Sequence, residues 1–189
     1  MNIEGIPAFV DNYIWMLSDG KRVAVVDPGD AKPVLKMLEA RGLEMAAILI
    51  THHHPDHTGG IKALRERWDV PVYGPAAEAA KFAGLTHPLN DGAHLRLDFL
   101  NLELQVMTIP GHTLGHIALY GSGILFCGDT LFSAGCGRLF EGTPAQMHHS
   151  LSRLAALPAD TAMYCGPQYT QANLAFATVV EPDKSTIST

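Results

Sequence analysis

Four side chains that can bind a metal ion stand within six residues of this chain. His52, His54, Asp56 and His57 lie in the segment Thr-His-His-His-Pro-Asp-His, at positions 51–57. Imidazole nitrogens and carboxylate oxygens suit Zn²⁺, and iron or manganese can also use such ligands. In an extended segment His52 and His54 point to the same side, because side chains alternate, whereas Asp56 and His57 follow after a turn. The spacing therefore predicts two adjacent metal positions.

A histidine-rich segment can also be a polar surface turn, but two later segments of the chain offer matching ligands. Residues 106–109 form an apolar run that leads to His112, and residues 123–127 form another that ends before Asp129. A carboxylate has two oxygens, so Asp129 can serve two metals. One predicted site contains His52, His54, His112 and Asp129, and a second, with one ligand fewer, contains Asp56, His57 and Asp129.

The remaining histidines are interpreted by their context. His116 follows His112 closely and has two interpretations, a hydrogen-bond partner of a metal ligand or a histidine at the edge of the core. Five others have no such context and are predicted to be ordinary surface or packing residues: His53, His87, His94, His148 and His149.

Hydrophobic patterning predicts the elements that must hold the ligands in place. The apolar run at 45–50 predicts a buried strand, so the histidine cluster follows a strand end, where open α/β sheets place their ligands. Strands are predicted at 2–6, 12–18, 22–27, 45–50, 70–73, 94–98, 101–109, 116–120, 123–127 and 162–165. Helices are predicted at 32–41, 59–68, 75–83, 144–156 and 171–178.

The helix at 144–156 has the clearest signals. Thr143 can cap it, Pro144 suits its first position, and Gln146 completes a capping box. Its expected core face contains Met147, Leu151 and Leu154. Because early strands come in runs and later strands are separated by helices, helices covering both outer faces of two packed sheets would satisfy the pattern.

Length and composition limit the class of protein. A chain of 189 residues with 17% charged residues is expected to form one globular domain, residues 1–189. The net charge of −6 disfavours a nucleic-acid partner, for which a basic patch is expected. No apolar run approaches the ~20 residues of a membrane span. No obligate protein partner is predicted.

The cysteines and the N-terminus indicate the compartment. Three cysteines cannot all pair, and their spacing matches no zinc motif. Cys127 and Cys165 stand in strand-like contexts and are expected to be buried thiols. The first residues have neither the basic start nor the apolar core of a signal peptide. We therefore expect a reducing cytoplasm.

Three motifs together resemble one enzyme family. They are the segment at 51–57, Gly-His-Thr-Leu-Gly-His at 111–116, and the run from Gly128 to Thr143 that reads GDTLFSAGCGRLFEGT. They are similar to hydroxyacylglutathione hydrolase (glyoxalase II), in the metallo-β-lactamase superfamily. The resemblance extends from about residue 2 to about residue 183. It implies an α/β fold, an αββα sandwich with all metal-ligand loops along one edge.

The resemblance also implies the cofactor and the reaction. His52, His54 and His112 would hold a first Zn²⁺, Asp56 and His57 a second, and Asp129 would bridge them. A bound metal lowers the pKa of water to ~7, and the resulting hydroxide attacks a thioester carbonyl. The expected small-molecule substrate is S-D-lactoylglutathione, and the products are D-lactate and glutathione. Asp56 and Asp129 are the candidate catalytic carboxylates.

The chain departs from the family pattern in two places. The family has a metal-binding histidine in a CGHEYT-like segment, whereas residues 165–170 here read CGPQYT, with Pro167 in its place. The family also continues into a helical C-terminal domain that helps to hold glutathione, whereas this sequence ends at Thr189. Of the other expected substrate contacts, Arg138 supplies a basic group, Phe140 stands where tyrosine is common, and Tyr169 matches.

Both departures are typical of an engineered, truncated or diverged version of the enzyme. Losing the histidine would weaken the second metal site, and losing the helical domain would remove contacts to glutathione. The alternatives are another enzyme on the same scaffold (a lactonase, a β-lactam hydrolase or a one-iron persulfide dioxygenase) and an inactive remnant that binds metal poorly.

Overall fold

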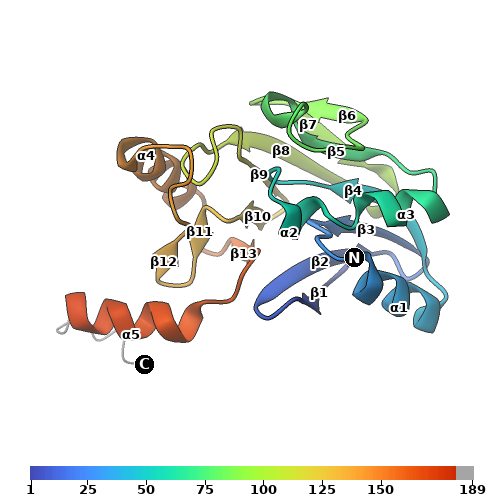
Figure 1. The fold of residues 1–189 in the computed structure, drawn as a ribbon, viewed down its shortest axis with the longest axis horizontal. Helices are drawn as coiled ribbons and strands as arrows, with labels where there is room; N and C mark the ends of the chain where they lie inside the picture. The colour runs from blue at the N-terminus through green and yellow to red at the C-terminus, as the bar shows by residue number, and fades with distance from the viewer. Residues whose placement is uncertain (182–189) are drawn as a thin grey trace.

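Two β-sheets pack face to face, and helices lie on their outer faces (Figure 1). The computed structural model describes residues 1–181. The six-stranded sheet runs in the order β1 (Asn2–Ala8), β2 (Asn12–Ser18), β3 (Arg22–Val26), β4 (Glu44–Leu49), β5 (Val72–Pro75) and β6 (His87–Leu89). Its first three strands are antiparallel, and the pairs from β3 to β6 are parallel.

The second sheet has five strands. Their order is β13 (Ala162–Cys165), β10 (Ile124–Gly128), β9 (Ile117–Gly121), β8 (Leu102–Thr108) and β7 (His94–Leu97). Only the β10–β13 pair in this sheet is parallel. A short ribbon of β11 (Leu131–Phe132) and β12 (Gly135–Cys136) follows β10.

Three apolar clusters form the layers. The central cluster joins residues of both sheets, for example Val26 and Leu49 with Leu104 and Phe126. A second cluster lies under α1 (Ala31–Arg41) and α3 (Ile61–Arg67), on the outer face of the six-stranded sheet. The third lies under α4 (Pro144–Ala155), on the outer face of the other sheet. The predicted αββα sandwich is therefore confirmed.

The predicted capping of α4 is also confirmed. The backbone N–H of Gln146 donates to the hydroxyl of Thr143, and the backbone N–H of Thr143 donates to the Gln146 side chain. Met147 and Leu154 are buried against the sheet, whereas Leu151 is only partly buried. The helix that follows the GDTLF…EGT run is thus fixed at its first turn.

Several sequence predictions were wrong in detail. The helix predicted at 75–83 is a single 3₁₀ turn, η1 (Ala76–Glu78), followed by turns. The helix predicted at 59–68 begins only at Ile61, and a separate short helix, α2 (Pro55–Thr58), precedes it. Strands β6, β11 and β12 were not predicted, because each has only two or three residues. Cys127 is buried as expected, but Cys165 is only partly buried.

The last described helix, α5 (Thr170–Val180), extends away from the sandwich (Figure 1). It has no buried residue, and Phe176 and Val179 are largely exposed. In the described part of the chain no helix is both long and apolar enough to cross a membrane.

Candidate metal centre and substrate pocket

The predicted metal ligands lie together at one edge of the sandwich. His52 and His54 follow β4, His112 follows β8, and Asp129 follows β10 directly. Asp56 and His57 lie in α2, which Pro55 begins, so they stand on a helical turn rather than on the loop that we expected. The ends of β4, β8 and β10 therefore bring these side chains together at one place.

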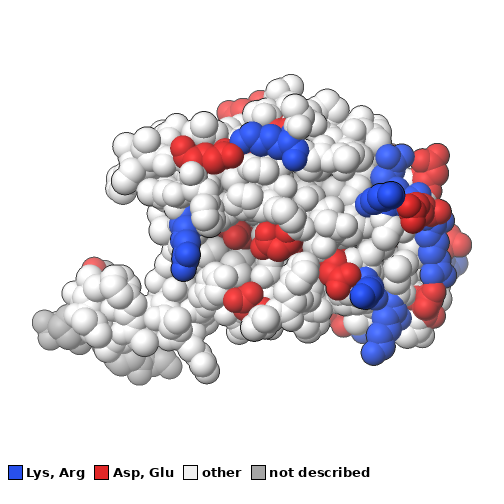
Figure 2. Space-filling view, in the orientation of Figure 1, with Lys and Arg blue, Asp and Glu red and all other residues white. Residues whose placement is uncertain are grey.

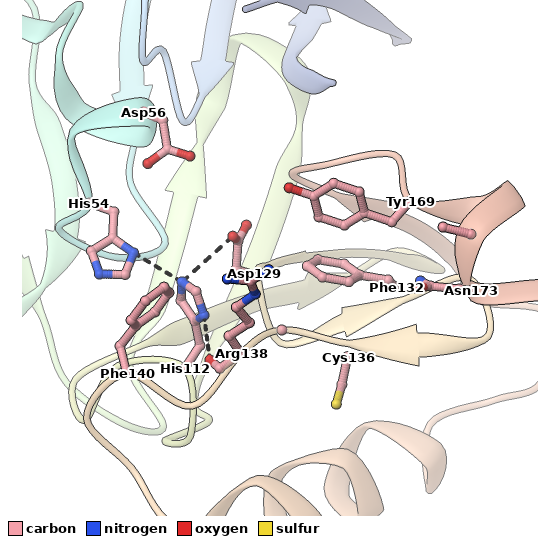
Figure 3. Close-up of a pocket in the computed structure, with 12 residues that line it drawn as sticks. His54, Asp56, His112, Asp129, Phe132, Cys136, Arg138, Phe140, Tyr169 and Asn173 are labelled. Atoms are coloured by element: carbon pink, nitrogen blue, oxygen red, sulfur yellow. Dashed lines mark hydrogen bonds and ion pairs between the residues drawn. The ribbon is translucent and has the colours of Figure 1, made fainter. Parts of the chain in front are cut away.

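The first group of ligand atoms is centred on His54. Its Nδ1 lies 3.1 Å from Nε2 of His52 and 3.0 Å from Nε2 of His112. Oδ2 of Asp129 lies 3.6 Å from the same nitrogen of His112. Figure 3 shows His54, His112 and Asp129 turned toward one another from different segments.

The second group is centred on His57. Its Nε2 lies 3.2 Å from Oδ1 of Asp129 and 3.5 Å from Oδ2 of Asp56. Ligand atoms of His52, His57 and Asp129 also lie within 4.8 Å of one another. Asp129 thus presents one oxygen to each group. Asp56, whose side chain is about half exposed, lies on the solvent side of the second group.

These atoms fit a cation. Two ligands bound tetrahedrally at about 2.0–2.1 Å from Zn²⁺ lie about 3.3 Å apart, and the separations above range from 3.0 to 3.6 Å. The Nδ1 of His54 carries at most one hydrogen, so it cannot donate to both neighbouring imidazoles. Nε2 of His57 and Oδ1 of Asp129 are buried without a hydrogen-bond partner in the described residues. A metal ion would satisfy all of these lone pairs.

The opposite ring nitrogens are held by neighbours. Nδ1 of His112 donates to the backbone carbonyl of Arg138, at 2.8 Å. Nδ1 of His57 faces Oδ2 of Asp27 at 3.1 Å, and the Thr51 hydroxyl donates to that same oxygen. The Thr51 oxygen can then accept from Nδ1 of His52, 3.1 Å away. Such contacts fix the tautomer of a metal-binding histidine and direct its other nitrogen at the metal.

Burial and neighbouring charges set the protonation of the three histidines in the first group. Burial lowers the pKa of His52 well below its usual range, and the neighbouring imidazole of His57 lowers it further. Burial also lowers the pKa of His54 and of His112. These rings are therefore neutral near pH 7 and offer their lone pairs.

The second group is electrostatically different. Burial opposes the charged form of His57, but the carboxylates of Asp27 and Asp129 raise its pKa well above the usual value. The neighbouring imidazole of His57 lowers the pKa of Asp56. Burial opposes the charged form of Asp129, but His57 lowers the pKa of that carboxyl as well. A cation that binds here must displace the proton of His57, as metals generally do at their ligands.

The structure separates the remaining histidines. His116 is fully buried, and its Nε2 accepts the backbone N–H of Asp129 at 3.1 Å, while its ring stacks on His52. Burial lowers the pKa of His116 to about 3, so it stays neutral. It therefore supports two ligands. His53 packs beside Glu78, with 17% of its side chain exposed. The other four are exposed, as predicted: His87, His94, His148 and His149.

A cavity of about 700 Å³ opens beside the ligand groups. Figure 3 shows Arg138, Phe140 and Tyr169 around it, and Figure 2 shows the corresponding face of the molecule hollowed. Arg138 is the only lysine or arginine among the lining residues in the described part of the chain. The ring of Phe140 packs edge-on against His54 and His112. The lining residues are His54, Asp56, His112, Asp129, Phe132, Cys136, Gly137, Arg138, Phe140, Tyr169, Ala172 and Asn173.

The segment at 165–170 packs against the second ligand group, where Gly166 lies beside His57 and Asp129. The position of a Cβ on Gly166 lies 2.7 Å from Oδ1 of Asp129 and 2.8 Å from Cε1 of His57, so only glycine fits there. Pro167 is buried next to it and pairs with Asn12. Gln168 accepts a hydrogen bond from the Tyr13 hydroxyl, so its carbonyl oxygen is engaged outside the ligand group.

The comparisons with known proteins agree with this geometry. The family model described as "Metallo-beta-lactamase superfamily" matches residues 8–166. The hydroxyacylglutathione hydrolase of Dechloromonas aromatica is 56% identical over 187 residues, which are 99% of this chain and 69% of that protein. The chain belongs to the hydroxyacylglutathione hydrolase family. A second member, from Pseudomonas fluorescens, is 56% identical over 191 residues and is covered to 73% of its length.

Solved structures show how widely this fold is shared beyond the hydroxyacylglutathione hydrolase family. The BLEG-1 B3 metallo-beta-lactamase has a TM-score of 0.80 at 27% identity, covering 87% of this chain and 91% of that one. ETHE1 from Myxococcus xanthus has a TM-score of 0.78 at 28% identity, covering 89% and 76%. TTHA1623 in a di-iron-bound form has a TM-score of 0.71 at 31% identity, covering 90% and 95%.

Sequence reasoning missed the residues that position the ligands. Asp27 stands at the end of β3, so its place after an apolar strand could have marked it as a partner of the histidines. Asn12 donates to Oδ2 of Asp56 at 3.0 Å, and no motif signals this contact. Glu78 is a fully buried carboxylate in a segment predicted to be an ordinary helix.

Proposed function

We propose that this chain hydrolyses glutathione thioesters, converting S-D-lactoylglutathione and water into D-lactate and glutathione. The observation that carries this proposal is the pair of ligand groups that share Asp129 at the wall of a cavity containing Arg138. The relatives at 56% identity, which are named hydroxyacylglutathione hydrolases, support the substrate class.

The chain's own residues have distinct roles in this proposal. His52, His54 and His112 would hold one Zn²⁺, Asp56 and His57 would hold a second, and Asp129 offers an oxygen to each group. When bound, the metal activates water and polarises the thioester carbonyl. Without a metal in the second group, Asp56, which is ionised and lines the cavity, would be free to orient the attacking water and accept its proton. The water oxygen bonds to the carbonyl carbon, the C–S bond breaks, and the thiolate leaves with a proton.

The substrate is held by the cavity wall. The guanidinium of Arg138 pairs with a carboxylate of the glutathione part, and a charge-assisted bond of this kind contributes about 1.5–3 kcal/mol. Phe140 and Tyr169 are exposed rings at the cavity and cover the apolar part of the thioester. Phe140 also restrains the imidazoles of His54 and His112, against which it packs.

The ligand types also favour a particular metal. Zn²⁺ suits the nitrogen-rich first group, and iron is the alternative, because one structural neighbour is described in a di-iron-bound form. We propose that residues 1–189 form one catalytic domain, because both ligand groups and the cavity belong to the same described part of the chain. The free cysteines suit a reducing cytoplasm.

The test is the initial rate of S-D-lactoylglutathione hydrolysis, measured by the loss of thioester absorbance. We expect a rate that a chelator abolishes and added Zn²⁺ restores. A β-lactam such as nitrocefin is the competing substrate, because a B3 metallo-beta-lactamase is among the similar structures. Zinc-dependent cleavage of nitrocefin without any cleavage of the thioester would contradict the proposal.

A further inference from the structure

Glu78 is a fully buried carboxylate outside the metal-ligand groups. It ends the 3₁₀ turn η1 that follows β5. Burying an ionised carboxylate is costly unless hydrogen bonds replace its hydration. Both carboxylate oxygens of Glu78 accept hydrogen bonds, which replace the hydration lost on burial.

The two oxygens of Glu78 contact two different loops. Oε2 accepts the backbone N–H of His53 at 2.7 Å and lies 3.0 Å from Nδ1 of the same residue. Oε1 accepts the Thr113 hydroxyl at 2.5 Å and the backbone N–H of Gly115 at 3.2 Å. One side chain therefore joins the loop after β4 to the loop after β8.

These loops carry the ligands of the first metal group. His53 stands between His52 and His54, and Thr113 directly follows His112. His54 and His112 approach each other from the two loops with their ring nitrogens 3.0 Å apart (Figure 3). A backbone hydrogen bond from Ile117 to Thr51 also joins the loops, but it lies at their strand ends. Glu141 makes a second link, because it accepts the backbone N–H of Leu114 at 2.9 Å and lies 3.7 Å from Nε2 of His53. Glu78 differs from Glu141 in being fully buried.

The contacts require a carboxylate in this place. Three N–H or O–H donors converge on Glu78, and only a carboxylate offers two oxygens without a hydrogen of its own. A glutamine would turn its NH₂ group toward one of the two loops and lose that attachment. Gly115 provides the space, because a Cβ there would lie 2.4 Å from Cγ of Glu78.

We propose that Glu78 is a positioning residue that sets the separation of the His52–His54 loop from the His112 loop and thereby the metal affinity of the first group. This rests on the proposed metal centre. It concerns the apo geometry of this chain, so it can be tested by metal binding without any measurement of hydrolysis.

The test compares Zn²⁺ affinity, by competition with a chromophoric chelator, in the wild type, Glu78→Gln and Glu103→Gln. Glu103 is an exposed carboxylate paired with His94 on the second sheet, so its substitution is the matched control. We expect Glu78→Gln to bind Zn²⁺ roughly 10–100-fold more weakly, the range for groups that orient a ligand. Glu103→Gln should bind like the wild type. The visible spectrum of bound Co²⁺ should change in Glu78→Gln alone.

A merely structural role would lower the melting temperature of the apo protein and leave the affinity and the Co²⁺ spectrum unchanged, which would overturn the proposal. Thr113→Val keeps the side-chain shape and removes one donor to Glu78, so we expect a smaller loss of affinity. If Glu78→Gln does not fold, the Zn²⁺ affinity of Thr113→Val is the test instead. An affinity equal to that of the wild type would then overturn the proposal. A wild type that binds no Zn²⁺ would overturn the metal centre itself.

Discussion

Asp27 and His57 form a buried pair in which Oδ2 of the carboxylate lies 3.1 Å from Nδ1 of the imidazole. Only 1% of the His57 side chain and 4% of the Asp27 side chain are exposed. The other partners of Asp27 are the backbone N–H and the hydroxyl of Thr51, the residue before His52. A single carboxylate at the end of β3 thus orients one histidine of each ligand group.

Replacing Asp27 with asparagine should weaken the second metal group most. The amide keeps the shape of the side chain but loses the negative charge that orients His57. Its NH₂ group would also face one of the N–H or O–H groups that donate to Asp27. We expect the second equivalent of Zn²⁺ to bind roughly 10–100-fold more weakly in isothermal titration. Asp30→Asn, which alters the cap of α1 three residues away, is the control. Identical isotherms for wild type and Asp27→Asn would show that Asp27 does not position a ligand.

Removing the metal should destabilise the folded protein. A ligand at about 100 times its dissociation constant adds about 2.7 kcal/mol to the free energy of unfolding. For a domain of this size each kcal/mol shifts the melting temperature by roughly 2–4 °C. Chelation should therefore lower the melting temperature by roughly 5–10 °C in differential scanning calorimetry.

His54→Ala removes the atom on which the first group is centred, so it should abolish both hydrolysis and the stabilisation by Zn²⁺. His149→Ala, an exposed histidine on α4, should change neither. Undiminished hydrolysis by His54→Ala would refute a metal-dependent reaction.

The position of Pro167 should limit binding in the second group. Proline has no side-chain donor, and its neighbour Gly166 approaches His57 and Asp129 closely. Pro167→His should raise the Zn²⁺ content per chain, measured by atomic emission, and raise the hydrolysis rate. Pro167→Ala removes the ring without adding a donor and should leave the Zn²⁺ content unchanged. An equal content in both variants would show that residue 167 does not reach the metal.

The candidate ligands could be predicted from the sequence because the segments that carry them follow apolar strands. Parallel and antiparallel strands in the two sheets bring β4, β8 and β10 to a common edge, so the ligands after them meet. The residues that support the ligands could not be found in the same way. Asp27 reaches Thr51 because β3 pairs with β4 in a register that places Val26 opposite Leu49, and no local pattern specifies that register.

The incorrect helix at 75–83 has a physical cause. Alanines favour a helix locally, but Glu78 is buried among donors from two loops, and Lys81 pairs with Glu141. These long-range contacts override the local preference. The sequence therefore predicted a helix at 75–83, whereas the structure has a 3₁₀ turn whose Glu78 connects two loops.

Arg138→Gln should separate substrate binding from chemistry. Arg138 is the only arginine or lysine among the described residues that line the cavity, while its backbone carbonyl, which the substitution retains, accepts the hydrogen bond from His112. We expect the KM for S-D-lactoylglutathione to rise about tenfold or more, with a smaller change in kcat, because a charge-assisted contact to the substrate is lost in ground and transition states alike. Arg65→Gln, at an exposed ion pair with Asp69, is the matched control. A fall in kcat at constant KM would instead place the guanidinium at the reacting group.

Thiol labelling should distinguish the three cysteines. Burial raises the pKa of Cys127 far above its usual value, and burial also raises the pKa of Cys165. Because the thiolate is the reactive form, both should resist iodoacetamide at pH 7.5, and Cys127 should still resist at pH 9. Cys136 is exposed at the cavity and should be labelled first, as mass spectrometry of tryptic peptides would show. In urea all three should react, which controls for access. Labelling of Cys127 in the folded protein at a rate equal to that of Cys136 would mean that strand β10 opens far more readily than its complete burial implies.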